Sequence, residues 1–99
     1  MKAKELSPVT RQIQKRFFAA LDVIMLRNGM SLQAFCNEYG LLRPKYSNIR
    51  AGKDEYYKHI DIEALAYLVH DFGVSSDWLL TGVGDMFKKV NVLQRVLIN

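Results

Sequence analysis

Hydrophobic residues recur along most of this chain at spacings of three and four, which is the period of helices that bury one side. The clearest example lies between Ser31 and Gly40, where the apolar positions are Leu32, Phe35, Cys36 and Tyr39. Serine is favoured as an N-cap, and glycine is favoured in the left-handed conformation that often ends a helix. The pattern therefore predicts a short amphipathic helix over 32–39.

A second helix is predicted to start at Arg43-Pro44 and to end at Gly52, because proline is tolerated at the first helical positions. On a helical wheel its apolar residues Leu42, Tyr46 and Ile49 cluster on one side. The opposite side consists of small or polar residues: Pro44, Ser47, Asn48 and Ala51. Small side chains allow a helix backbone to approach another surface closely, and a DNA major groove admits a helix of this kind.

Three further helices follow from the same signals. One is predicted from Ser7-Pro8 to about Asn28, with a core side formed by Val9, Ile13, Phe17, Ala20, Leu21 and Ile24. Another follows Asp61 as N-cap and ends at Gly73, and its apolar stripe begins at Ile62. The last is a short helix capped by Ser75 or Ser76, in which Trp78 and Leu79 are expected to be buried.

The segment 31–53 resembles the helix-turn-helix of lambda-repressor/Cro-type proteins, which include phage repressors, antitoxins and small bacterial regulators. The match rests on the short first helix, Gly40 in the turn, hydrophobic residues at 41, 46 and 49, and Gly52. The segment 72–82, FGVSSDWLLTG, resembles the block that closes the domain in many bacterial members, so the similarity covers residues 11–87. It implies an all-α, five-helix DNA-binding domain over residues 1–87, followed by a C-terminal extension, 88–99.

Some positions depart from the pattern of that family. Leu32 stands where the family often has a glutamine that touches the DNA backbone, and Gln33 is a substitute with a different direction. The family often pairs a glutamate near the end of the second motif helix with an arginine of the first helix. The corresponding positions here hold Arg50 and Met25, so we expect no such internal pair and an Arg50 that faces phosphate. Pro44 replaces a polar side chain that reads bases in many relatives.

Charge is unevenly distributed along the chain, although the net charge is only +4. Residues 1–53 hold ten Lys and Arg against three acids, for +7, whereas residues 54–87 hold one Lys against seven acids, for −6. The remaining residues, 88–99, add +3. The cations therefore concentrate in the part that contains the predicted helix-turn-helix, as binding to a phosphate backbone requires.

These observations predict binding to double-stranded DNA, with the helix that starts near Arg43 in the major groove. Arg43 and Asn48 are the first candidates for base readers, followed by Lys45 and Ser47. The resemblance implies phosphate contacts from the residues around the motif, for which the candidates are Ser31, Gln33, Arg50 and Lys53. The predicted function is transcriptional regulation, with repression as the most plausible form.

Enzymatic and metal chemistry are not expected. Cys36 lies on a predicted buried side, and His59 and His70 belong to no cluster with metal-ligand spacing. The GVGD sequence lacks the spacing of a phosphate-binding loop. We therefore expect no cofactor, no metal and no small-molecule ligand. A single cysteine, the absence of an apolar segment in MKAKELSPVT and the short run 17–26, which Asp22 interrupts, favour a cytoplasmic protein without a membrane span.

Two questions stay open at this point. The tail KKVNVLQRVLIN fits both a helical and an alternating pattern, and with the excess apolar surface of the first helix it suggests a homodimer. The alternative to DNA binding is a protein-interaction module of the same fold, such as an antitoxin-like partner of a toxin. Pro44 and Leu32 favour that alternative, and the charge distribution opposes it.

Overall fold

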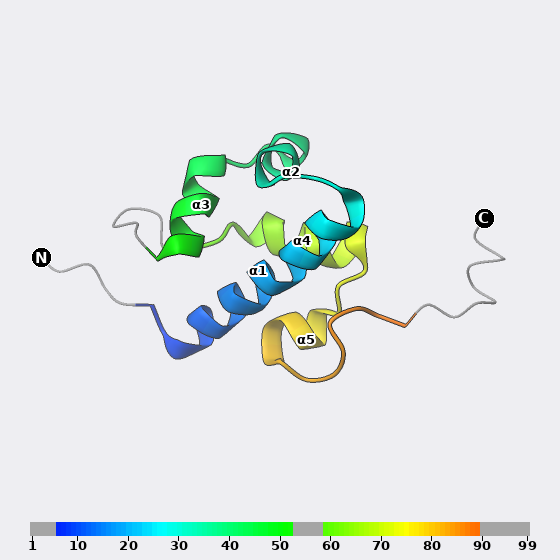
Figure 1. The fold of residues 1–99 in the computed structure, drawn as a ribbon. Coiled ribbons are helices and arrows are strands. Elements are labelled where there is room, and N and C mark those ends of the chain that lie inside the picture. The colour runs from blue at the N-terminus through cyan, green and yellow to red at the C-terminus, as the bar shows by residue number, and fades with distance from the viewer. Residues whose placement is uncertain (1–5, 53–58, 90–99) are drawn as a thin grey trace, which may run out of the picture.

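The computed structural model describes residues 6–52 and 59–89, which form five helices and no strand (Figure 1). In chain order they are α1 (Pro8–Asn28), α2 (Leu32–Tyr39), α3 (Arg43–Ala51), α4 (Ile62–Phe72) and α5 (Ser76–Thr81). The expectation of an all-α protein is confirmed for this part of the chain. The predicted dimerisation tail lies outside the described residues from Val90 on, and residues 1–5 and 53–58 lie outside them as well.

The helices begin and end where capping residues predict. Ser7, Ser31 and Ser75 are N-caps whose hydroxyls accept a backbone hydrogen bond from the third residue beyond. Every helix is followed by a glycine in the left-handed conformation, which explains why such short helices have sharp ends. The capping pattern therefore determines the lengths of the elements, and tertiary packing stabilises them.

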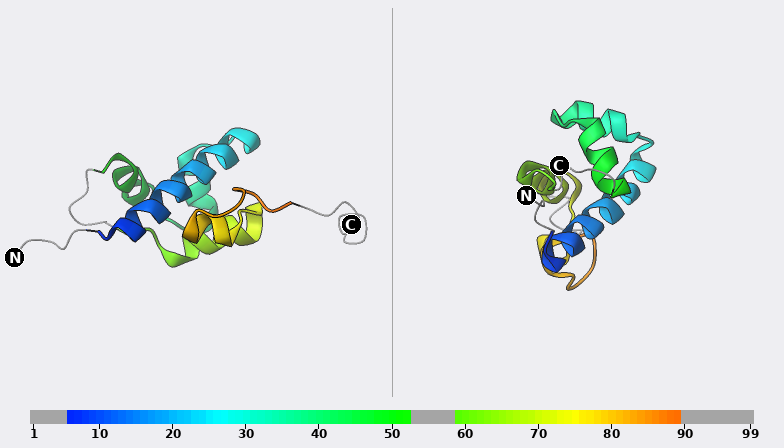
Figure 2. Two further views of the ribbon diagram at one scale, coloured as in Figure 1. Left: turned by 90° about the horizontal axis from the view of Figure 1, so that it is seen from below. Right: turned by 90° about the vertical axis from the view of Figure 1, so that its left-hand side faces the viewer.

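Helix α1 crosses the molecule and contacts α4 and α5, while α2 packs against α3. Figure 1 shows α2 and α3 together along one edge and α5 at the opposite edge, and the views in Figure 2 agree. The buried core is drawn from all five helices and from two connecting segments: Phe17, Ala20, Leu21, Ile24, Phe35, Cys36, Tyr46, Ile60, Ala64, Leu68, Val74 and Leu79. Cys36 is buried as a free thiol, as expected.

Three predicted core positions are wrong. Val9 is 65% exposed, because the first turn of α1 extends beyond the helices that cover its centre. Leu42 is 62% exposed, since it occupies the N-cap of α3 in an extended conformation and does not share the helical wheel of Tyr46. Ile62 is also largely exposed, at the first residue of α4. All three lie at helix starts, where a periodic pattern continues past the region that a neighbouring helix covers.

The chain returns to the core after α5. Val74 and Phe87 form an antiparallel bridge, in which Ser75 donates its N–H to Met86 and Lys88 donates its N–H to Gly73. The Phe87 ring lies 4.6 Å from the Arg27 guanidinium at the end of α1. Residues up to Lys88 are therefore attached to the helical domain, one residue beyond the predicted boundary at 87.

Candidate nucleic-acid interface

Helices α2 and α3 are joined by a tight turn that fixes their relative position. Gly40 has φ 67° and Leu41 donates its N–H to the Cys36 carbonyl at 2.8 Å, which closes α2. Helix α3 then starts at Arg43 with proline as its second residue. The turn spans only a few residues, so the orientation of α3 follows from the end of α2 and from what α3 buries.

The buried side of α3 is anchored by Tyr46. This residue is completely buried, and its ring centroid lies 6.0 Å from that of Phe17 in α1. Ile49 is partly buried against the same core. One side of α3 is thus fixed against α1 and the core, which leaves the opposite side toward solvent.

The outward side of α3 is a low ridge that we call the α3 ridge, formed by Pro44, Ser47, Asn48 and Ala51. Pro44 and Ala51 are exposed, and Ser47 and Asn48 are partly exposed. Arg43 is exposed at the start of the helix and is aligned with Ser47, four residues further along. Three of the four predicted base readers, Arg43, Ser47 and Asn48, therefore lie on or beside one outward surface.

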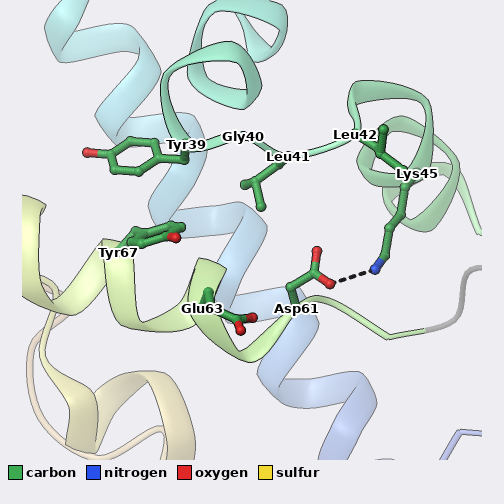
Figure 3. A pocket seen from close by; sticks show the side chains of 8 residues that line it. All are labelled: Tyr39, Gly40, Leu41, Leu42, Lys45, Asp61, Glu63 and Tyr67. Atoms are coloured by element: carbon green, nitrogen blue, oxygen red, sulfur yellow. Dashed lines mark hydrogen bonds and ion pairs between the residues drawn. The ribbon is translucent and has the colours of Figure 1, made fainter.

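Lys45 differs from the other three predicted base readers. Its side chain is only 17% exposed, and its ammonium donates to the Asp61 Oδ1 at 2.9 Å, as the dashed line in Figure 3 shows. The Tyr46 hydroxyl donates to Asp61 Oδ2 at 2.6 Å and accepts the Asp61 N–H at 3.2 Å. This cluster joins α3 to the start of α4, so Lys45 points toward α4 and away from the α3 ridge.

Asp61 was expected only as an N-cap of α4. It occupies that position, but its side chain makes no capping hydrogen bond, since both carboxylate oxygens are used by Tyr46 and Lys45. The hydrogen bonds from Tyr46 and Lys45 lower the pKa of Asp61 from its usual 3.8. Burial, followed by the hydrogen bond to Asp61, raises the pKa of the Tyr46 phenol.

Arg50 has an internal partner, contrary to expectation. Its guanidinium forms an ion pair with the Asp22 carboxylate of α1 and lies 5.7 Å from the centroid of the Phe18 ring. The family resemblance indicated Met25 as the facing position, which lies about one helical turn beyond Asp22 on α1. The available signal was Asp22 itself, the only charge that interrupts the apolar run 17–26. Arg50 remains 41% exposed, so its outer edge is accessible to solvent.

The predicted phosphate-binding residues are placed as follows. Ser31 is exposed, and its hydroxyl accepts the Ala34 N–H at 3.1 Å as a helix cap. Gln33 is exposed and donates to the Asn37 side chain at 2.8 Å, one turn along α2. Lys53 lies outside the described residues. Ser31 and Gln33 thus both lie at the exposed N-terminal turn of α2, where backbone N–H groups point outward.

One cation of α1 is used inside the fold. The Arg16 guanidinium donates to the Leu79 carbonyl at 2.8 Å and to the Leu80 carbonyl at 3.1 Å, which caps the C-terminus of α5. These hydrogen bonds occupy the Arg16 guanidinium within the fold. Its role depends on a contact between segments 63 residues apart, which no local pattern indicates.

A pocket of about 420 Å³ lies between the turn after α2 and the start of α4 (Figure 3). Tyr39 and Tyr67 stack at one end with ring centroids 4.6 Å apart, and the Lys45–Asp61 pair lies at the other. Burial, followed by a hydrogen bond to Asp71, raises the pKa of Tyr39 to about 12. The stacked rings of Tyr39 and Tyr67 join the end of α2 to α4.

Other kinds of site find no support in the part of the chain that the structure describes. It contains no group of three or more His, Cys, Asp or Glu residues that can hold a metal ion. None of its helices combines the length and the hydropathy that a membrane span needs.

No protein-family model, no curated protein and no solved structure matches this chain.

Proposed function

We propose that this protein is a sequence-specific double-stranded DNA-binding protein of the lambda-repressor type that acts as a transcriptional regulator, most plausibly a repressor. The observation that carries the proposal is the α3 ridge. A helix of nine residues presents proline, serine, asparagine and alanine outward, with an exposed arginine at its first position. A solvated helix surface more often carries long charged side chains, whereas this one permits close approach to a groove.

The chemistry of the ridge fits base edges. Arginine pairs with the two acceptors of guanine, and asparagine pairs with the acceptor and donor of adenine, in the major groove. Arg43 and Asn48 are separated by five residues on α3, so one lies at the entry of the helix and the other near its middle. We assign Arg43, Ser47 and Asn48 as base readers. Lys45 is assigned instead to supporting α3 through Asp61, because its side chain is only 17% exposed and its ammonium is bound to the Asp61 carboxylate.

Phosphate binding is assigned to groups around the ridge. The candidates are Ser31 and Gln33 at the start of α2 and Arg50 in the last turn of α3, together with Lys53, which follows α3 in the sequence and lies outside the described residues. In the described part of the chain, α1 to α3 carry mostly cations, and α4 and α5 carry the acids Glu63, Asp71 and Asp77. These cations lie on α1 and α3, so this separation attracts a polyanion to those helices and away from α4 and α5.

A homodimer is part of the proposal. One α3 helix contacts only a few base pairs, so two copies whose α3 helices lie about 34 Å apart read two half-sites separated by one helical turn. The apolar segment 90–99 is the candidate dimerisation element, and light scattering of a protein truncated after Lys89 tests it. A dimer mass that survives the truncation would remove this part of the proposal.

The proposal is tested by selecting binders from a randomised duplex library at about 0.15 M salt, where non-specific binding is already weakened. The double variant Arg43→Ala/Asn48→Ala is selected in parallel. A charge-matched control, Lys88→Ala, removes one positive charge at an exposed position in the segment after α5. We expect a two-fold symmetric motif with the unsubstituted protein and with the control, and none with the α3 double variant.

Failure to enrich a motif, together with duplex affinity that disappears as salt rises, would contradict sequence-specific binding. In that case a protein-interaction module of the same fold becomes the better interpretation, and partners become the object of search. Enrichment of a motif that the α3 double variant retains would instead show that DNA is read by another surface.

A further inference from the structure

Both flanks of the α3 ridge carry a cation that is paired with a carboxylate from another helix or its cap. Lys45 is paired with Asp61 at the start of α4, and Arg50 is paired with Asp22 of α1. The two pairs differ in their environment. The Lys45 side chain is 17% exposed and Asp61 also binds the Tyr46 hydroxyl, whereas Arg50 and Asp22 are 41% and 47% exposed.

Because the two pairs differ in exposure, they have different effects on stability and on surface charge. The Lys45–Asp61 pair belongs to a partly buried network and is explained by its contribution to the position of α3. Exposed ion pairs such as Arg50–Asp22 contribute little to stability, because both charges are well solvated without each other. The carboxylate of Asp22 therefore has a larger effect on charge than on folding, since it neutralises a cation at the edge of the proposed DNA-binding surface.

Arg50 is positioned for a second anion. It lies seven residues after Arg43, so the two guanidinium groups follow the same side of α3, adjacent to the α3 ridge. A duplex docked on the ridge brings phosphates to both margins of the helix, because the groove is bounded by the two backbones. The Asp22 carboxylate and a DNA phosphate then compete for one guanidinium.

We propose that Asp22 lowers the affinity of this protein for DNA of any sequence, by holding Arg50 in an intramolecular ion pair. This inference rests on the proposed function. Non-specific binding is almost entirely electrostatic, and each phosphate neutralised by a protein cation makes the slope of log K against log salt concentration more negative by about 0.9. Withholding one cation weakens binding to every sequence alike, while contacts to base edges are unchanged.

The test is a salt titration of binding to a duplex of arbitrary sequence with the isosteric variant Asp22→Asn. We expect its salt dependence to be steeper by up to about 0.9 and its affinity at about 0.15 M salt to be roughly two- to fivefold higher. Asp85→Asn is the matched control, because it makes the same change in net charge at an exposed position in the turn after α5. Its salt slope is expected to equal that of the unsubstituted protein. Thermal unfolding of each variant verifies that the domain stays folded.

A double-mutant cycle with Arg50→Gln identifies the cation that is released. The gain from Asp22→Asn is expected to disappear in the Arg50→Gln background. An unchanged salt slope in Asp22→Asn, an equal gain in Asp85→Asn, or a gain that persists without Arg50 would each overturn the inference and leave the proposed function intact. Absence of duplex binding by the unsubstituted protein at low salt would overturn both.

Discussion

Replacement of Tyr46 by phenylalanine removes one hydroxyl from the cluster that joins α3 to α4. That hydroxyl donates to the Asp61 carboxylate at 2.6 Å and accepts the Asp61 N–H at 3.2 Å, and the Tyr46 side chain is completely buried. The ring remains, so packing against Phe17 is preserved. The variant therefore isolates the hydrogen bonds from the hydrophobic contribution of the residue.

The expected cost follows from the kind of hydrogen bond that is lost. Hydrogen bonds to charged groups contribute about 1.5–3 kcal/mol, and the lower half of that range applies because the Asp61 side chain is 37% exposed. We expect Tyr46→Phe to lower the free energy of unfolding by about 2 kcal/mol. In a domain of this size that corresponds to a decrease in Tm of roughly 10 °C.

Urea unfolding followed by circular dichroism measures this change, and Tyr39→Phe is the matched control. Tyr39 also loses a hydrogen bond to a carboxylate, that of Asp71, but Tyr39 is only partly buried whereas Tyr46 is completely buried, so its cost is expected to stay below about 0.5 kcal/mol. Equal costs for the two variants, or a cost below about 0.5 kcal/mol for Tyr46→Phe, would refute the structural role assigned to the cluster.

Four further predictions concern named side chains. The folded-state pKa of Asp61 is lowered, so its stabilising contribution is present above its unfolded pKa near 3.8 and is lost as pH falls through the folded value. Between about pH 5 and pH 2, the Asp61→Asn variant is therefore expected to lose less stability than the unsubstituted protein. Urea unfolding midpoints measured as a function of pH test this. Arg16→Ala is expected to lower the free energy of unfolding by about 1–2 kcal/mol, because α5 loses its C-terminal cap, and to leave the salt slope of DNA binding unchanged. Lys15 is exposed, so Lys15→Ala is expected to change the free energy of unfolding by less than about 0.5 kcal/mol. A shallower salt slope in Arg16→Ala would contradict the assignment of Arg16 to the α5 cap. Asn48→Ala is expected to cost about 1–3 kcal/mol of binding to a selected duplex and to relax one base position, and an equal loss for all sequences would count against base reading. Lys53→Ala, in contrast, is expected to weaken binding to all sequences and to flatten the salt dependence, and a sequence-selective loss would contradict a phosphate role.

Helix positions were predictable from the sequence because their ends carry strong local signals. Serine caps and following glycines mark α1, α2 and α5, and the observed bounds agree with the predicted ones. The burial of Phe17, Phe35 and Tyr46 was also predictable, since each lies at the centre of an apolar stripe. Burial at helix starts was not, because periodicity does not show how far a neighbouring helix extends.

The outward side of α3 was predictable for the same reason, but the partners of its flanking cations were not. The carboxylates that bind Lys45 and Arg50 come from residues 16 and 28 positions away. Such pairing depends on how α1 and α4 are placed around α3, and the local patterns of a single sequence do not indicate that arrangement. Asp61 carried a local signal for a helix cap, and the tertiary hydrogen bonds to Tyr46 and Lys45 replaced that role.

The most direct test of the proposed DNA-binding surface is a map of backbone amide resonances of isotope-labelled protein during titration with a short duplex at low salt. Non-specific binding is sufficient for this measurement, so no operator is needed. The predicted result is that shifts concentrate at Arg43, Ser47, Asn48 and Ala51 and at the start of α2, while α5 is unaffected. Shifts confined to α5 or to Lys88 and Lys89, with α3 unperturbed, would contradict binding through the α3 ridge.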